Sequence, residues 1–357
     1  MSRPTADNEG GLVTRGERHE SPYRRFQAAE GIPVYRGSAI DDVRHLDVAS
    51  WPRTAQKGAF INLADQEEDD AYVLEIAPGG NTEVLHHLFE AGIVVLDGHG
   101  ATSFRQPSTP KQTVEWQPGS LFAPPLNCYY QHFNLDGTAS ARLLVVTNAP
   151  MIINLFRNFD FVFRESYVFE DRYKGEDDYF ADKGYQDGGS GPWKTNFVPD
   201  LRTFRLGQYR SKEHRGSGNA GMGFALSNNS MAAGVSLFPV GTYKKAHRHG
   251  VGAHILILQG EGYSRLWSDG EPPRRVDWRE GTLVSPRELE YHQHFNSGPS
   301  PAMYLKFRLG NLDSRRGASE PDQIEYEDED PHIYEEYAEQ SALHGAKVVL
   351  RHPALLA

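Results

Sequence analysis

Short apolar runs recur along most of the chain, and turn-forming Gly, Pro, Asn and Asp residues separate them. Runs of about four to eight residues bounded in this way predict β-strands, because a helix needs a longer segment with a period near 3.6. The runs with the strongest β character lie at 72–76, 93–96, 143–146, 235–238, 255–258 and 303–307. Many short strands with turns at close intervals are typical of a β-sandwich or jelly roll.

The first half of the chain repeats the second half at a constant offset of 162 residues. The register holds without a gap over about 55 residues, which indicates a duplicated domain, and a repeat of this length is a whole fold rather than a solenoid unit. The matching pairs are Gly79 and Gly241, His87 and His249, Gly98 and Gly260, Gly100 and Gly262, Trp116 and Trp278, Gly119 and Gly281, Pro124 and Pro286, and the run 131–134 with 293–296.

The repeat and the shifts in composition divide the chain into five segments. The ends differ from the two copies: residues 1–22 are polar and predict a loosely held arm, 315–331 are strongly acidic and predict a solvated stretch, and 333–350 predict a short C-terminal helix. The five segments are a leading segment at 1–55, the first copy at 56–150, an aromatic-rich connector at 151–205, the second copy at 206–312, and the acidic stretch with its helix at 313–357.

Aromatic residues crowd the connector. Phe159, Phe161 and Phe163 recur at every second position, which predicts a strand or extended segment with one buried face. We expect these rings to seal one copy against the other or against a second subunit, and the alternative is an aromatic lid over a pocket. The Gly- and Ser-rich residues 185–193 predict a loop that could gate a site.

Composition narrows the classes of function. The chain has 357 residues, enough for two domains, and its net charge of -11 argues against a nucleic-acid partner. The single Cys128 leaves no disulfide framework and fits a reducing cytosol. No apolar run is long enough to span a membrane, so we expect a cytoplasmic protein without a membrane partner.

The second copy carries the strongest chemical pattern. His247 and His249 stand at i and i+2, so on an extended segment their side chains share one face. His292, on a later predicted strand, can complete a set of three nitrogens that leaves coordination positions open. Such a set suits one divalent transition metal per chain, such as Fe(II), Mn(II), Ni(II), Co(II) or Zn(II).

These residues resemble the two signatures of the cupin superfamily, a glycine followed by His-x-His and a later His-x-x-x-Asn. Gly241, His247 and His249 match the first signature, and His292 and Asn296 match the second. The resemblance, together with the repeat, implies an all-β bicupin: two tandem jelly-roll barrels with a short C-terminal helix.

The acidic ligand usual in cupins is missing, because Ala253 and His254 stand where the glutamate is expected. A one-residue bulge would make His254 a fourth ligand, whereas counting back from Gly260 puts Ala253 in the slot and turns His254 outward. His294 lies at i+2 from His292 and should face the barrel interior, where it could orient a ligand, contact substrate or act as a general base. Because His132 persists in the first copy, shared packing is the alternative.

The first copy has lost most of this pattern. At the offset of 162 residues, Leu85 stands opposite His247 and Tyr130 opposite His292, and only His87 keeps its position. We therefore expect a structural barrel without a metal. A rearranged site remains as the alternative if the strand bulges, and it would be built from His86 or His87, Glu90 and His132.

The resemblance to cupins with all-histidine sites, including gentisate dioxygenases, implies a non-haem Fe(II) dioxygenase. It would act with O2 on a small oxygenated substrate, either aromatic or a diketone or acid, and form a homodimer, with iron favoured over manganese, zinc or nickel. The alternatives are an O2-independent Lewis-acid enzyme (isomerase, cyclase, lyase or decarboxylase) and a non-catalytic barrel that binds a small molecule. Side chains that could hold a carboxylate, or form surface ion pairs instead, are Arg265, Arg287, Arg308 and Tyr304.

Overall fold

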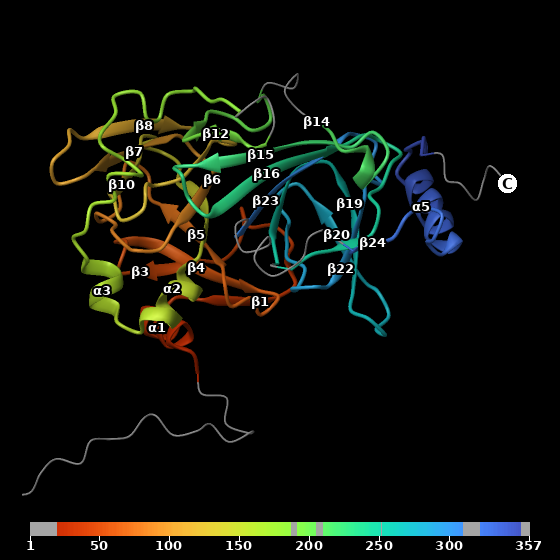
Figure 1. Cartoon of the computed structure of the whole chain (residues 1–357), viewed down its shortest axis with the longest axis horizontal. Helices are drawn as coiled ribbons and strands as arrows, with labels where there is room; N and C mark the ends of the chain where they lie inside the picture. The colour runs from red at the N-terminus through yellow and green to blue at the C-terminus, as the bar shows by residue number, and fades with distance from the viewer. Residues whose placement is uncertain (1–19, 187–190, 205–209, 251, 310–321, 351–357) are drawn as a thin grey trace, which may run out of the picture.

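The computed structural model describes residues 20–186, 191–204, 210–250, 252–309 and 322–350. Two β-barrels lie side by side, the first running from orange to yellow and the second from green to blue (Figure 1). The prediction of two tandem jelly-roll barrels with a short C-terminal helix is confirmed. All six of the apolar runs named above lie in strands.

The first barrel is built from two sheets, in the orders β1-β4-β5-β11-β6-β9-β13 and β10-β7-β8, with β3 paired to β4. Its strands are β1 (Val34–Gly37), β3 (Ala49–Trp51), β4 (Gln56–Leu63), β5 (Asp70–Ile76), β6 (Ala91–Asp97), β7 (Gly100–Arg105), β8 (Gln112–Trp116), β9 (Leu121–Phe122), β10 (Tyr129–Asn134), β11 (Ala141–Thr147) and β13 (Phe197–Val198).

The second barrel repeats this plan with sheets in the orders β12-β15-β16-β23-β18-β21-β2 and β20-β19-β22-β17-β24, and β14 pairs with β15. Its strands are β2 (Ala39–Ile40), β12 (Trp193–Thr195), β14 (Arg210–Ser211), β15 (Ala220–Leu226), β16 (Met231–Phe238), β17 (His247–Arg248), β18 (His254–Gln259), β19 (Glu261–Trp267), β20 (Arg274–Arg279), β21 (Leu283–Val284), β22 (Tyr291–Phe295), β23 (Ala302–Leu309) and β24 (Asp322–Gln323).

Alternation along β18 shows how each strand serves two cores, since successive side chains of a strand point to opposite faces. Ile255 and Ile257 pack inside the second barrel with Trp278. Leu256 and Leu258 point the other way, into a large apolar cluster that also contains Leu144 and other residues of the first barrel. The two barrels are therefore joined by a shared apolar layer.

Each barrel also receives a strand from the segment that precedes the other one. β2 pairs with β21 of the second barrel, and β13 pairs with β9 of the first. The backbone hydrogen bonds just after these two strands are equivalent: Val43 N donates to Gly281 O at 2.9 Å, and Leu201 N donates to Gly119 O at 2.9 Å. The leading segment and the connector are thus equivalent parts of the duplicated unit.

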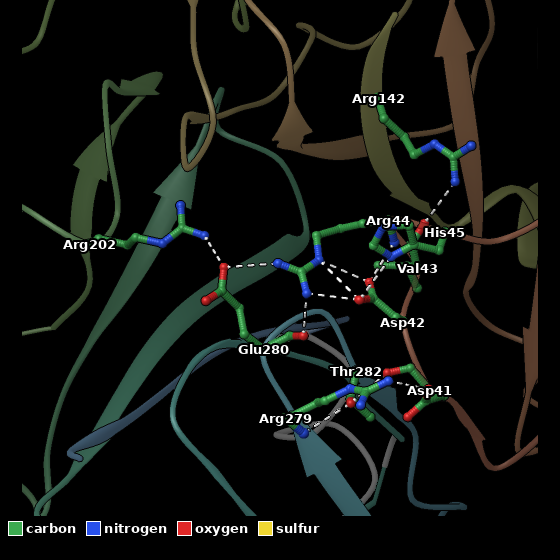
Figure 2. A network of polar contacts seen from close by, with 10 residues as sticks. All are labelled: Asp41, Asp42, Val43, Arg44, His45, Arg142, Arg202, Arg279, Glu280 and Thr282. Atoms are coloured by element: carbon green, nitrogen blue, oxygen red, sulfur yellow. Dashed lines mark hydrogen bonds and ion pairs between the residues drawn. The ribbon is translucent and has the colours of Figure 1, made fainter. Parts of the chain in front are cut away.

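A polar network closes this exchange between the barrels (Figure 2). Arg44 binds the Asp42 carboxylate at 2.8 Å, and its guanidinium also donates to the Glu280 carbonyl oxygen at 2.8 Å. The Glu280 carboxylate accepts from Arg202 at 3.0 Å. Arg44 also donates to this carboxylate at 3.2 Å. Because Arg44 comes from the leading segment and Arg202 from the connector, the Glu280 carboxylate ties both exchanged segments together.

The helices lie outside the barrels (Figure 1): α1 (Pro22–Glu30), α2 (Ala149–Phe156) and α3 (Phe159–Arg164) beside the first, and α5 (Pro331–Leu343) beside the second. The extended conformation predicted for 159–163 is wrong, since these residues form α3. The Asn158 side chain caps this helix by accepting from Phe161 N at 2.9 Å. The segment is too short for its sequence pattern to separate a helical period from a strand period, and the Asn158 cap stabilises the helix.

The acidic stretch is only partly described, because 310–321 lie outside the described residues. In its described part Asp322, Glu327, Asp328 and Asp330 are exposed as predicted, whereas Glu329 is buried. β24 adds an edge strand to β17, and Glu329 is 7% exposed, with its carboxylate accepting from the Tyr243 hydroxyl and from Gln293. The predicted C-terminal helix is confirmed as α5, which ends at Leu343.

Two further predictions lie largely outside the described residues. Of the polar arm predicted at 1–22, residues 1–19 are not described, and of the loop at 185–193, residues 187–190 are not described. The described start of that loop is anchored, because Tyr185 and Lys194 form a backbone bridge. None of the helices in the described part of the chain has the length and apolar character needed to cross a bilayer.

Candidate metal centre and cationic cavity

Three histidines of the second barrel converge on one point. β17 pairs with β22 so that His247 and His292 are direct cross-strand partners. His249 follows β17, and its carbonyl oxygen is held by Leu289 N at 3.0 Å. One ring nitrogen from each histidine lies within 4.8 Å of the others. The prediction that these three imidazoles face each other is confirmed.

The hydrogen bonds prepare two of these rings for a metal. His247 Nδ1 lies 3.1 Å from Lys245 O, and His292 Nδ1 lies 3.0 Å from Glu290 O. A carbonyl oxygen only accepts, so Nδ1 carries the proton and the Nε2 lone pair points into the cluster. Burial and the neighbouring imidazoles lower the pKa of both rings well below the usual value.

Neutral imidazoles with oriented Nε2 lone pairs fit a divalent transition metal, which binds deprotonated nitrogen. In the residues that the structure describes, this trio is the only set of three or more His, Cys, Asp or Glu side chains that could hold an ion. No carboxylate joins it there. His247, His249 and His292 would therefore hold the metal, with further coordination positions left for substrate.

The structure does not bring His254 into this cluster. β18 begins at His254, and its pairing with β23 runs without a shift from His254 to Ile257, so the bulge that would turn this ring inward is absent there. His254 instead points toward the first barrel, where its Nδ1 lies 3.6 Å from Asp69 Oδ1. The alternative in which Ala253 occupies the glutamate position and His254 turns outward is the one observed.

His294 lies beside the cluster, with its ring centroid 5.7 Å from that of His292 and 5.4 Å from that of Tyr304. Trp278 Nε1 donates to Ser264 Oγ at 3.1 Å, and Ser264 Oγ lies 2.7 Å from His294 Nδ1. The indole N–H can only donate, so Ser264 Oγ accepts from Trp278, and we assign the hydroxyl hydrogen of Ser264 to His294 Nδ1. This assignment puts the proton of His294 on Nε2.

This tautomer changes the role expected for His294. Its Nε2 is buried and has no hydrogen-bond partner in the described part of the chain. A protonated Nε2 donates a hydrogen bond, so this tautomer favours a donor role for His294 over the role of general base. The first barrel holds the same relay, from Trp116 through Thr102 to His132, which supports the alternative of a structural role shared by both histidines.

A cavity of about 510 Å³ opens onto the histidine cluster and is lined by His247 and His249. Its other charged side chains are basic, with no Asp or Glu among the lining residues that the structure describes. Lys244 Nζ donates to the Tyr304 hydroxyl at 2.8 Å and also to Ser236. The basic residues of the wall are Lys212, Arg215, Lys244, Lys306 and Arg308.

Burial sets the charge of two of these lysines. It lowers the pKa of Lys244 to about 7, with Arg215 adding to the effect, and lowers the pKa of Lys306 to about 8. Removing an ammonium group from water without a counter-ion disfavours its charged form. An anion in the cavity would supply that counter-charge, so the cavity is suited to an anionic ligand.

Most of this basic wall was not identified from the sequence. Of the side chains expected to hold a carboxylate, Arg308 and Tyr304 line the cavity. Arg265 does not line it and instead pairs with Glu336 at 3.8 Å. The usable signal was alternation along β23, where Tyr304, Lys306 and Arg308 share one face. Lys244 lies in a loop and Arg215 at the end of the short 3-10 helix η3 (Glu213–Arg215), and only the fold places them in the cavity.

The first barrel does not assemble the rearranged site. The Glu90 carboxylate accepts from Ser230 N and Met231 N at 2.9 Å each, so it faces the second barrel. His86 Nδ1 lies 3.3 Å from Phe163 O, and His132 belongs to the relay with Thr102. These side chains serve separate structural contacts.

Comparisons with known proteins support the fold. No protein-family model matches the chain, and no curated protein matches it by sequence. Solved structures of oxalate decarboxylase do match: one that reports its substrate binding mode has a TM-score of 0.50 and 12% identity, with 76% of each chain covered. Tryptophan-to-tyrosine and glutamate-to-alanine variants of the Bacillus subtilis enzyme each have a TM-score of 0.50, 13% identity and the same coverage of 76%.

At this identity the likeness is one of fold. Oxalate decarboxylase is a bicupin, so the bicupin fold expected from the sequence is confirmed. The narrower expectation of a gentisate-dioxygenase type gains no support from these neighbours.

Proposed function

We propose that this chain is a metal-dependent bicupin enzyme that acts as a lyase, of the decarboxylase type, on a small carboxylate. One observation carries the proposal: three clustered imidazoles adjoin a cavity of about 510 Å³ in which every charged side chain among the described lining residues is basic. The likeness of fold to oxalate decarboxylase supports the reaction class by analogy only, because one fold hosts many activities.

A divalent ion held by the three histidines would supply Lewis acidity toward a substrate oxygen. The chain's own residues supply the remaining functions. Lys306 and Arg308 lie on the cavity face of β23 and are placed to bind a carboxylate, with Arg adding a bidentate geometry. His294 Nε2–H is placed to donate to a second substrate oxygen.

Decarboxylation breaks the bond between the carboxyl carbon and its neighbour, releases CO2 and leaves the electron pair on the neighbouring carbon. That carbon then takes up one proton, and no oxidant or reductant is consumed. Lys244 Nζ, hydrogen-bonded to the Tyr304 hydroxyl, is the group that can hold and deliver this proton. A pKa of about 7 for Lys244 suits proton transfer near neutral pH.

The Fe(II) dioxygenase expected from the sequence is the second candidate. Three nitrogen ligands leave positions for both O2 and a bidentate substrate, which supports it, but the fold neighbours favour the O2-independent alternative. The two reactions differ in a measurable way, since only a dioxygenase consumes O2 in proportion to product.

The test combines elemental analysis with turnover. We expect about one manganese or iron ion per chain, lost in His249→Ala and retained in the matched first-barrel variant His87→Ala. Mono- and dicarboxylates are then screened for CO2 release under nitrogen, with an oxygen electrode on parallel samples. CO2 release without O2 supports the proposal. Stoichiometric O2 uptake would assign the dioxygenase instead, and a protein without metal even after reconstitution would leave only a binding barrel.

A further inference from the structure

A second cavity, of about 240 Å³, lies inside the first barrel. Leu85, His87 and Tyr130 line it, and these residues correspond to the three clustered histidines at the offset of 162 residues. The cavity therefore occupies the place that the metal centre has in the second barrel. The first barrel lacks two of the three metal-binding histidines but keeps a cavity at the same place.

Aromatic rings form the walls of this first-barrel cavity, and they come from α1, α3 and neighbouring strands. Trp51 meets Phe60 and Tyr72 edge to face, at centroid distances of 5.4 and 5.2 Å. Phe163 of α3 stacks on Phe26 of α1 at 5.5 Å. Rings in these orientations offer both faces and edges to a further ring.

Three polar side chains of this cavity, His87, Tyr130 and Tyr72, are bonded to each other, and the buried Nε2 of His86 has no hydrogen-bond partner in the described residues. His87 Nδ1 lies 2.7 Å from Phe89 O, and His87 Nε2 lies 2.7 Å from the Tyr130 hydroxyl, which also bonds Tyr72. The histidine is uncharged at neutral pH, because burial lowers its pKa to about 3. The inner wall of the cavity therefore has no net charge.

Two arginines border the cavity, and each is ion-paired: Arg164 Nη1 lies 3.2 Å from Asp160 Oδ1, and Arg53 pairs with Glu30. Arg53 Nε donates to Glu30 Oε2 at 2.8 Å, and the guanidinium lies 4.2 Å from the Phe163 ring centroid and 5.2 Å from that of Phe26. An arginine stacked and ion-paired in this way extends the aromatic wall rather than attracting a free anion. This is the reverse of the second barrel, whose cavity has basic residues and no acid among its described lining.

We infer that the first barrel is a separate binding site for a small, neutral aromatic molecule. The volume agrees with this class, since an apolar cavity of about 150 Å³ is enough to stay dry and bind benzene. Protein interiors rarely leave a void of this size unfilled. A molecule of one or two fused rings would complete the ring contacts, and a charged group on it would meet no partner inside.

The test is isothermal titration calorimetry on the full chain with 2-naphthol, and with 2-naphthoate as the charged probe of similar shape. We expect one 2-naphthol per chain and at least tenfold weaker binding of 2-naphthoate. Val84 borders the cavity and is 44% exposed, so Val84→Trp can obstruct the cavity without disturbing the core. It should weaken 2-naphthol binding at least tenfold, as should the inner variant Leu85→Phe.

Leu155→Trp is the matched control, because Leu155 is 68% exposed on α2 and does not line the cavity. It should bind 2-naphthol like the wild type, as should His249→Ala. Equal binding of the two probes, binding unchanged in Val84→Trp and Leu85→Phe, or binding lost in His249→Ala would overturn the inference. So would binding that appears only after residues 1–19 are removed, since the chain itself would then be the occupant. Metal content of Val84→Trp reports separately on the second barrel.

Discussion

The Tyr130 hydroxyl lies 2.7 Å from His87 Nε2, at the place where the second barrel sets His292 beside His249. The Nδ1 of His87 is bonded to a carbonyl oxygen, so its Nε2 accepts the tyrosine hydrogen and its lone pair is occupied. The backbone at this position is unchanged, since Leu85 and Tyr130 form the same cross-strand bridge as His247 and His292. At this position the two barrels differ in their side chains and not in their strand pairing.

If so, the double variant Leu85→His/Tyr130→His should bind a second metal ion. The new rings would stand on a backbone bridge like that of the second barrel, and His87 would recover its Nε2 lone pair. Elemental analysis should rise from about one to about two ions per chain. Adding His87→Ala should return the value to one. A folded double variant that still holds one ion would show that the backbone match is insufficient.

The relay to His294 predicts a tautomer that can be observed directly. Long-range ¹⁵N–¹H NMR on the metal-free protein should show the proton of His294 on Nε2, and Ser264→Ala should shift the population toward Nδ1–H. Loss of one oriented hydrogen bond, about 0.5–1.5 kcal/mol, should lower kcat up to about tenfold. Thr102→Ala is the matched control, because it should change the tautomer of His132 and leave turnover intact.

Anion binding should weaken as the pH rises. Burial lowers the pKa of Lys244 to about 7 and that of Lys306 to about 8, so both ammonium groups lose their protons between about pH 6 and 9. Calorimetry with oxalate on the metal-free protein should show falling affinity over that range. Lys244→Met should bind more weakly at pH 6 and show a smaller change up to pH 8. Affinity independent of pH would contradict the charge state assigned here.

The contribution of Lys244 to the free energy of unfolding changes with pH in the opposite direction to anion binding. An unfolded lysine keeps its proton up to about pH 10.5, the usual value, whereas Lys244 in the fold releases its proton near 7. The unfolded state therefore binds more protons between pH 7 and 10.5, so the contribution of Lys244 to the free energy of unfolding increases with pH there. In urea titrations, Lys244→Met should remove part of this slope.

Gly281 and Gly119 should be intolerant of a side chain. Both have positive φ, and an added Cβ would lie 2.3 Å from Asp42 Oδ1 at Gly281 and 2.4 Å from Asp200 Oδ1 at Gly119. Gly270 is the matched control, with φ +80 and nothing within 4 Å. Gly270→Ala should cost only the strain of the left-handed backbone, about 1–2 kcal/mol. In urea denaturation, Gly281→Ala and Gly119→Ala should lower the free energy of unfolding by clearly more, because the exchanged segments must move.

The sequence by itself determined the duplication, the all-β class and the trio of histidines. These follow from local rules: a constant offset aligns two copies, and side chains two apart on a strand share a face. The same rules identified the loss at Leu85 and Tyr130. They also left His254 and His294 with two possible roles each, because the strand register and the hydrogen-bond partners were unknown.

Only the tertiary structure decided the rest. One strand register turns His254 toward Asp69, and a distant Trp278 reaches His294 through a hydrogen-bond relay over Ser264. The basic wall joins Lys244, Arg215 and residues of β23 that are far apart in the chain. The physical reason is common to all of these: burial and partner choice depend on contacts between distant segments, and the local alternation of side chains carries no information about them.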